Sequence, residues 1–356
     1  MKTADIPKIR LHNQQLEKGK FIKPDRLLSW LAAIQAQDYQ GAKWSLGLRL
    51  PGSTEAMIEQ ALSEKKMVRT WLMRGTLHFV AASDVRWMLN LLAPRIISRN
   101  ARRYRELELD EPTLARSNEV LKNALQEGEE SNRRDLLLIL EENGISTKGQ
   151  RAAYLLQRAS LDGLICQSVT IRNNPSYISL DSLPKNNTIK PEYGLVELAK
   201  RYFTTRGPAT LQDFVWWSGL LMADAREGLE GVMSDLVSED LNGKTYWRTP
   251  HPTLESDLLP KVHLLPSFDE FLISYKDRSA SLVTPSAQEV AVGNRFKNTI
   301  AINGEVVGTW KRDLKNDGMI ITSILFRILD AKENNALKSA GKRYVEFLGA
   351  TAYDVK

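Results

Sequence analysis

The sequence has very little cysteine: Cys166 is the single one among 356 residues. One cysteine excludes an internal disulfide bond and any zinc finger that depends on cysteine ligands. Cys166 follows Leu164 and Ile165, and this apolar setting predicts a small buried side chain rather than a nucleophile. The four histidines show no pairing at a spacing of three or four residues. We therefore expect no metal site and no other cofactor.

Long apolar runs are lacking as well. The chain has no run of about 18 apolar residues, the length that a membrane-spanning helix needs. The segment from Met1 to Pro7 lacks the apolar core of a signal peptide. A hydrophobic content of 42% with 26% charged residues is typical of a globular protein in water. We therefore expect a cytoplasmic protein with two to three domains.

The excess of positive charge is modest, but it gathers locally. A net charge of +6 permits binding to phosphate backbones without demonstrating it. The basic residues form two clusters, namely Arg95, Arg99, Arg102, Arg103 and Arg105, and then Arg133, Arg134, Lys148, Arg151 and Arg158. A solvated helix face would explain either cluster alone. Because each cluster lies beside a helix-turn-helix pattern, the two together favour DNA as the partner.

The clearest pattern of secondary structure covers residues 109–183. Apolar spacing predicts helices over 112–126, 133–142 and 148–161. Two β-rich runs follow, 164–171 and 177–180, with turn residues between them. Three helices followed by a hairpin is the order of a winged helix, whose third helix is the recognition element.

The same order recurs in other parts of the chain. Three predicted helices between residues 193 and 237 precede a hairpin that turns at Asn242-Gly243. The N-terminal region fits more loosely, with helices at 24–34 and 54–64 before strands at 67–72 and 76–80. The predicted fold is mainly α with β-hairpins, an α+β class. Its predicted domains are three winged-helix units at 1–108, 109–188 and 189–256 and a β-rich domain at 257–356.

A pair of glutamines, Gln35 and Gln37, follows the predicted helix at 24–34. In a continuing helix their side chains would lie roughly 200° apart and could not act together. In an extended chain the two amides point to the same face and can bind one water molecule without carrying charge. The alternative is that both are ordinary polar residues at a helix end.

Five blocks of sequence together resemble one family, the tandem winged-helix DNA-binding proteins that include the AlkZ-like and YcaQ-like DNA glycosylases. The blocks occur in the family's order and span nearly the whole chain. They are 34–38 (IQAQD), 68–78 (VRTWLMRGTLH), 207–219 (GPATLQDFVWWSG), 264–269 (LLPSFD) and 304–310 (GEVVGTW).

The resemblance implies three winged-helix units and a C-terminal β domain that curve around a DNA channel. It also implies hydrolysis of the N-glycosidic bond of alkylated purines, including bulky N7 adducts and crosslinks. The family's catalytic motif is Gln-Φ-Gln in the AlkZ-like branch and Gln-Φ-Asp in the other, so Gln35 and Gln37 are the implied catalytic residues. Asp38 lies one place too late for the carboxylate form. In an enzyme, both amides should be accessible within a basic concavity.

The block from Val68 to His78 has two interpretations. As a functional block, Arg69, Arg74, Thr76 and His78 meet phosphates near the lesion, with His78 as a less favoured catalytic base. As a structural block, its aromatic residues pack a wing, with the arginines outside. The predicted DNA contacts are these four residues together with Arg99, Arg102, Arg103, Lys148 and Arg151.

Two further motifs favour structural roles. The spacing of Ser267 and Glu270 is that of a capping box, so the carboxylates near it are expected to start a helix. Trp216 and Trp217 are more typical of a core than of a base-stacking platform. The expected partner is double-stranded DNA, bound by a monomer without membrane or nucleotide cofactor. The main alternative is a winged-helix regulator without catalysis, since fold does not settle function.

Overall fold

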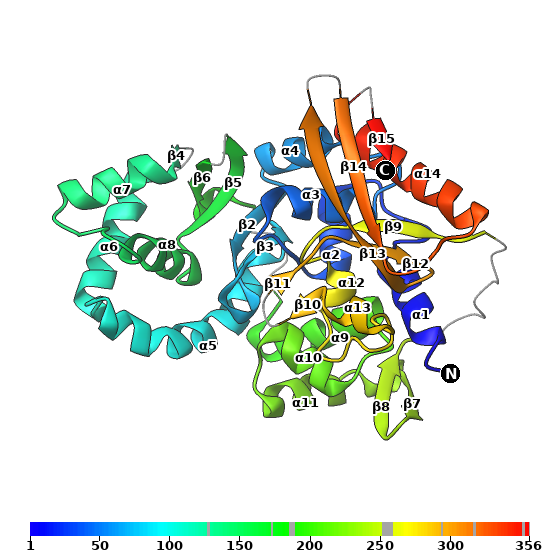
Figure 1. The fold of residues 1–356 in the computed structure, drawn as a ribbon. Helices are drawn as coiled ribbons and strands as arrows, with labels where there is room; N and C mark the ends of the chain where they lie inside the picture. Colours follow the sequence, from blue (N-terminus) through cyan, green and yellow to red (C-terminus); the bar gives the residue numbers. More distant parts are fainter. Residues whose placement is uncertain are drawn as a thin grey trace. The chain divides into compact units, whose positions relative to one another are not determined.

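A computed structural model describes residues 1–126, 129–171, 174–184, 189–250, 259–292, 295–315, 318–350 and 353–355 (Figure 1). The fold is mixed α and β, as predicted. Contacts divide the chain into two compact units. The first unit joins Met1–Ile58 to Val196–Lys356, and the second is Glu59–Leu195. None of the described helices is both long and apolar enough to cross a membrane.

The second unit contains an antiparallel sheet with strands in the order β3-β2-β5-β6-β4. Its strands are β2 (Met67–Trp71), β3 (Leu77–Ala81), β4 (Glu130–Asn132), β5 (Ile165–Ile171) and β6 (Asn174–Ser179). A single 3-10 turn, η1 (Met73–Gly75), joins β2 to β3. The hairpins predicted at 67–80 and 164–180 are therefore confirmed, although residues 172 and 173 of the second turn lie outside the described residues.

Four helices accompany this sheet. They are α5 (Val85–Glu106), α6 (Glu111–Ala124), α7 (Arg133–Glu142) and α8 (Arg151–Leu161). Their apolar faces meet in one buried core that includes Leu121, Leu136, Leu155 and Tyr177. The predicted order of three helices and a hairpin is thus present between residues 111 and 179.

The helices of the first unit come from both ends of the chain. They are α1 (Asp5–Asn13), α2 (Pro24–Leu31), α3 (Tyr39–Gly47), the start of α4 (Glu55–Ser63), α9 (Gly194–Arg206), α10 (Leu211–Ser218), α11 (Met222–Glu230), α12 (Glu270–Ile273), α13 (Pro285–Gln288) and α14 (Ala331–Phe347). Thr210 starts α10 with a capping box to Asp213. Helix α11 is shorter than predicted: it ends at Glu230, with Gly231 as its C-cap, rather than near Val237.

A five-stranded sheet completes the first unit, in the order β15-β14-β13-β12-β9. The strands are β9 (Val262–Leu265), β12 (Thr299–Ile302), β13 (Glu305–Lys315), β14 (Gly318–Leu325) and β15 (Tyr353–Val355). Two small hairpins accompany it, β7 (Val237–Leu241) with β8 (Lys244–Arg248) and β10 (Ala291–Val292) with β11 (Arg295–Phe296). Asn242 and Gly243 both have positive φ, 52° and 73°, as the predicted two-residue turn requires.

The β-rich C-terminal region does not pack by itself. The indole of Trp44 in α3 donates to the Leu264 carbonyl of β9 at 2.6 Å, and its ring lies 4.8 Å from that of Tyr344 in α14. This sheet and the N-terminal helices therefore form one core. The division into three winged-helix units and a fourth domain stays a prediction.

Candidate active site and DNA-contacting residues

The chain leaves α2 before the two glutamines. Helix α2 ends at Leu31, where Ala32 adopts φ 65° and ψ −54°. The short strand β1 (Ile34–Gln35) follows. The hypothesis that the glutamine segment is extended rather than helical is therefore confirmed for Gln35. The predicted helix over 24–34 is three residues too long, because a residue with positive φ cannot continue an α-helix.

The two glutamines differ in exposure. Gln37 is exposed, whereas Gln35 is only 8% exposed. The expectation that both amides are accessible is thus met by Gln37 and wrong for Gln35. Asp38 is the N-cap of α3, where its carboxylate accepts the Gly41 N–H at 3.1 Å. This capping role agrees with the expectation that Asp38 is no part of the amide motif.

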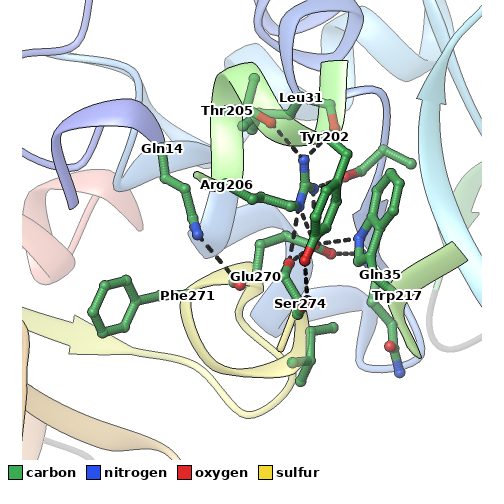
Figure 2. Close-up of polar contacts among 12 residues, drawn as sticks. Gln14, Leu31, Gln35, Tyr202, Thr205, Arg206, Trp217, Glu270, Phe271 and Ser274 are labelled. Atoms are coloured by element: carbon green, nitrogen blue, oxygen red, sulfur yellow. Dashed lines mark hydrogen bonds and ion pairs between the residues drawn. The ribbon is translucent and has the colours of Figure 1, made fainter. Parts of the chain in front are cut away.

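A buried ion pair lies directly behind this segment (Figure 2). Arg206, the last residue of α9, contacts Glu270 at 2.8 Å, and both side chains are 0% exposed. Arg206 also donates to two backbone carbonyls, that of Leu31 at 2.8 Å and that of Ala33 at 3.0 Å. Glu270 accepts the Gln35 N–H at 2.9 Å. Figure 2 shows the Gln35 side chain directed away from this pair.

Glu270 is also held by the residues around it. Ser274 Oγ donates to its Oε2 at 2.6 Å, and the indole of Trp217 donates to the same atom at 3.0 Å. Trp217 is fully buried, which confirms its predicted place in the core, whereas Trp216 is exposed and the same prediction is wrong for it. The expectation that a carboxylate here starts a helix is confirmed for Asp269, the N-cap of α12, whose side chain accepts the Phe271 N–H at 2.9 Å. The predicted capping box between Ser267 and Glu270 is wrong. Glu270 does not cap α12, because its carboxylate points to Arg206.

A second buried ion pair lies one residue away. Arg49 contacts both carboxylate oxygens of Asp269 at 2.8 Å, and neither side chain is exposed. Arg49 also donates to the Ser45 carbonyl and to the Gln14 side chain. In the described residues none of its hydrogen bonds reaches residues 31–37. The two pairs are alike in chemistry and burial, but only Arg206–Glu270 holds the glutamine segment.

Two predicted DNA contacts are buried in the second unit. Arg69 is 7% exposed and donates to Gln167 Oε1 on β5 at 3.0 Å. The ring of His78 is fully buried, with Nδ1 2.9 Å from the Thr76 carbonyl oxygen. The expectation that both arginines lie outside is wrong for Arg69, because β2 is an inner strand with both faces covered. Neither Arg69 nor His78 is placed to meet a phosphate.

The turn between β2 and β3 carries the remaining residues of this block. Arg74 and Thr76 are half-buried, and Arg74 has a positive φ of 59° within η1. Thr76 Oγ1 donates to the Met73 carbonyl at 3.2 Å. The turn thus places Arg74 and Thr76 nearer to solvent than the strand residues Arg69 and His78.

Helix α5 presents arginines along one face. Positions 95, 99, 102 and 103 follow the spacing i, i+4, i+7, i+8, which lines one side of a helix. Arg99 is exposed and has no ion-pair partner among the residues that the structure describes. The side chains of Arg102 and Arg103 are 86% and 37% exposed, and both pair with Glu106. Their hydrogen bonds lower the pKa of Glu106, so that glutamate offsets part of the positive face.

The predicted recognition helix, α8, provides fewer candidate DNA contacts than α5 does. Lys148 is exposed in the loop before α8. Arg151 instead donates to the backbone carbonyls of Ser146, Leu107 and Glu108, which ties α8 to the end of α5. Arg158 pairs with Glu111 and Asp162. Arg151 is half-buried and has a structural role, since its guanidinium binds three carbonyls, and a DNA contact at Arg151 stays a prediction.

Comparison with known proteins decides the family. The family described as "DNA glycosylase AlkZ-like" matches residues 28–347, which includes the glutamine segment, Arg206 and Glu270. The chain belongs to the AlkZ-like DNA glycosylase family. The predicted resemblance is thus confirmed. DNA glycosylases are hydrolases that cleave N-glycosyl bonds, so the predicted enzyme class and the DNA substrate are confirmed with it.

One relative and one solved structure add to this result. An "Interstrand DNA cross-link repair glycosylase" from Streptomyces sahachiroi is 23% identical over 328 residues, which is 85% of each chain. The structure of the Streptomyces sahachiroi DNA glycosylase AlkZ matches with a TM-score of 0.81 at 18% identity, over 100% of this chain and 99% of that one. At this identity the structural match shows a shared fold.

The buried carboxylate of this glycosylase predicts a pH dependence. Burial by itself raises the pKa of Glu270, but the charge of Arg206 and the hydrogen bonds to the carboxylate bring it down to about 2. Because this is below the ordinary value of 4.5, the carboxylate stabilises the folded state above pH 4.5, and the stabilisation is lost as the pH falls toward 2.

Glu270→Gln is therefore expected to be less stable than wild type at pH 7, with the difference shrinking between about pH 4.5 and pH 2. Urea unfolding at a series of pH values measures the difference. A gap between the two proteins that stays constant through this range would contradict the assignment.

Proposed function

We propose that this glycosylase hydrolyses the N-glycosidic bond of purines alkylated at N7, including bulky adducts and crosslinks, in double-stranded DNA. The observation that carries the proposal is that the strand ending at Gln35 is followed by an exposed neutral amide, Gln37, while the adjacent carboxylate of Asp38 caps a helix. The name of the Streptomyces sahachiroi relative supports crosslinks as part of the substrate range.

The chemistry of the lesion explains why amides suffice. A purine alkylated at N7 is cationic, so the bond from C1′ to N9 breaks with its electron pair passing to the base, which leaves neutral. Little acid assistance is needed. What remains is to place a water molecule below C1′ and to stabilise an oxocarbenium-like sugar, and oriented neutral dipoles can do both. The water oxygen bonds to C1′, and its proton passes to solvent.

The two amides have different tasks in this proposal. Gln37 is exposed and orients the attacking water. Gln35 is largely buried, so its amide supports the site from behind the surface. A pair of amides is a poor general base, which restricts the enzyme to bases that are already good leaving groups. A bulky adduct in a groove also makes less demand on base flipping than most glycosylase substrates do.

DNA binding falls to the basic residues that the second unit exposes. We infer phosphate contacts by Arg99, Arg102, Arg103 and Lys148, with Arg74 and Thr76 at the turn between β2 and β3. Backbone contacts of this kind carry little sequence information, which suits an enzyme that searches for lesions. We further propose that the protein acts as a monomer on the nucleoid, without a metal or nucleotide cofactor.

Release of the base tests the function. A duplex containing 7-methylguanine is incubated with an excess of protein, and the freed base is quantified by mass spectrometry. The proposal requires time-dependent release of 7-methylguanine with no loss of unmodified guanine. Tight binding to duplex without release of any N7 or N3 adduct would favour the non-catalytic alternative.

A further inference from the structure

One buried side-chain pair, Arg206 and Glu270, binds the backbone before the glutamines. Three hydrogen bonds reach residues 31–35 from this pair: Arg206 to the Leu31 carbonyl, Arg206 to the Ala33 carbonyl and the Gln35 N–H to Glu270. The partners come from α9 and α12, which are far from α2 in the sequence (Figure 2). The segment is thus fixed by elements outside itself.

The held segment has an unfavourable backbone conformation. Ala32 lies between the two carbonyls that Arg206 binds, and its φ of 65° with ψ of −54° is rarely adopted by a residue with a side chain. Such a conformation costs on the order of 1–3 kcal/mol and persists where its surroundings enforce it. Arg206 supplies that enforcement by binding the carbonyls on either side of Ala32.

The geometry needs an arginine. The guanidinium uses Nη1 for Leu31, Nη2 for Ala33 and both Nη2 and Nε for Glu270, with Nε also donating to Ser274 Oγ. A lysine ammonium is a compact charge with three donors and cannot span this set of acceptors. It would keep a cation beside Glu270 while losing the hold on the backbone.

We propose that Arg206 and Glu270 are positioning residues for the catalytic amides: the pair fixes the backbone of residues 31–35 and so sets where Gln35 and Gln37 present their amides. This inference rests on the proposed function of the glutamines. Neutral amides act by orienting water, and a displacement of about 1 Å at a positioned group can cost on the order of 10²-fold in rate. Rigid support of residues 31–35 is therefore needed for the full catalytic rate.

Arg206→Lys tests the proposal, with Arg49→Lys as the matched control. Both substitutions replace the arginine of a fully buried pair by a lysine. Single-turnover release of 7-methylguanine, the Kd for the same duplex and the melting temperature are measured for each. We expect Arg206→Lys to release the base about 10-fold more slowly with an unchanged Kd. Arg49→Lys should show a similar loss of melting temperature with a rate within about 2-fold of wild type.

A milder variant covers the case in which Arg206→Lys does not fold. Ser274→Ala removes the hydroxyl that binds both Glu270 Oε2 and Arg206 Nε, without removing a charge. It should slow release by about 3-fold and leave the Kd unchanged. An unchanged rate in Ser274→Ala together with equal rates in the two lysine variants would overturn the positioning proposal.

A double variant separates this proposal from the function on which it rests. If Arg206 acts through the glutamines, Arg206→Lys should slow wild type but add little to Gln37→Ala. Fully additive effects would show that Arg206 acts elsewhere and would overturn the positioning role. If Gln37→Ala alone keeps the wild-type rate, the failure belongs to the proposed function of the glutamines.

Discussion

Gln37→Ala is expected to release 7-methylguanine roughly 10²-fold more slowly than wild type, the usual scale for one positioned catalytic group. The amide is exposed at the end of an externally held segment, so its removal takes away the water-orienting group without opening a cavity. The Kd for duplex DNA should stay nearly unchanged, because a neutral side chain contributes little to binding that is mainly electrostatic. Single-turnover kinetics and a binding isotherm measure both quantities.

Two variants sharpen this prediction. Gln40→Ala removes another exposed glutamine three residues away, in the first turn of α3, and should keep the wild-type rate. Gln37→Asp creates the motif of the other branch of the family and is expected to keep activity. If Gln37→Ala excises the base as fast as Gln40→Ala does, Gln37 is not catalytic.

Reversing three charges on α5 is expected to weaken DNA binding on the order of 10²-fold at about 0.1 M salt, since each phosphate contact is worth roughly 1 kcal/mol. The variant carries Arg99→Glu, Arg102→Glu and Arg103→Glu. The slope of log Kd against log salt concentration should become shallower by about three. The loss should be similar for any duplex sequence, because phosphate contacts carry no sequence information.

Two controls bracket this experiment. Reversal at Lys332, Lys338 and Lys342, exposed lysines of α14, changes the net charge equally and should cost far less affinity. Glu106→Gln removes the carboxylate that pairs with Arg102 and Arg103, so it should strengthen binding. An α5 variant that binds as the α14 variant does would show that the DNA surface lies elsewhere.

Local signals in the sequence predict much of the fold. Asn242-Gly243 and Asn303-Gly304 mark two hairpin turns because both residues of each pair must take positive φ, and all four do. The extended state at Gln35 was predictable, because in a continuing helix the amides of Gln35 and Gln37 could not act together.

The features missed in the sequence depend on contacts between distant residues. Arg206 and Glu270 are 64 positions apart, and neither shows locally that the other neutralises it. Glu270 has the spacing of a capping residue, and only its depth in the fold gives it another role. Arg69 looks exposed because it is charged, yet an inner strand and Gln167 bury it. The structural role of Arg151 likewise depends on three carbonyl partners that are distant from it or outside its helix.

We expect neutral amides to restrict this glycosylase to bases that are already cationic. The wild-type protein tests this restriction on two duplexes of one sequence, one containing 7-methylguanine and the other hypoxanthine, a neutral purine. We expect release of 7-methylguanine and no detectable release of hypoxanthine over the same time. Release of hypoxanthine at a comparable rate would require acid assistance that two glutamines cannot give. That result would contradict the restriction to cationic bases.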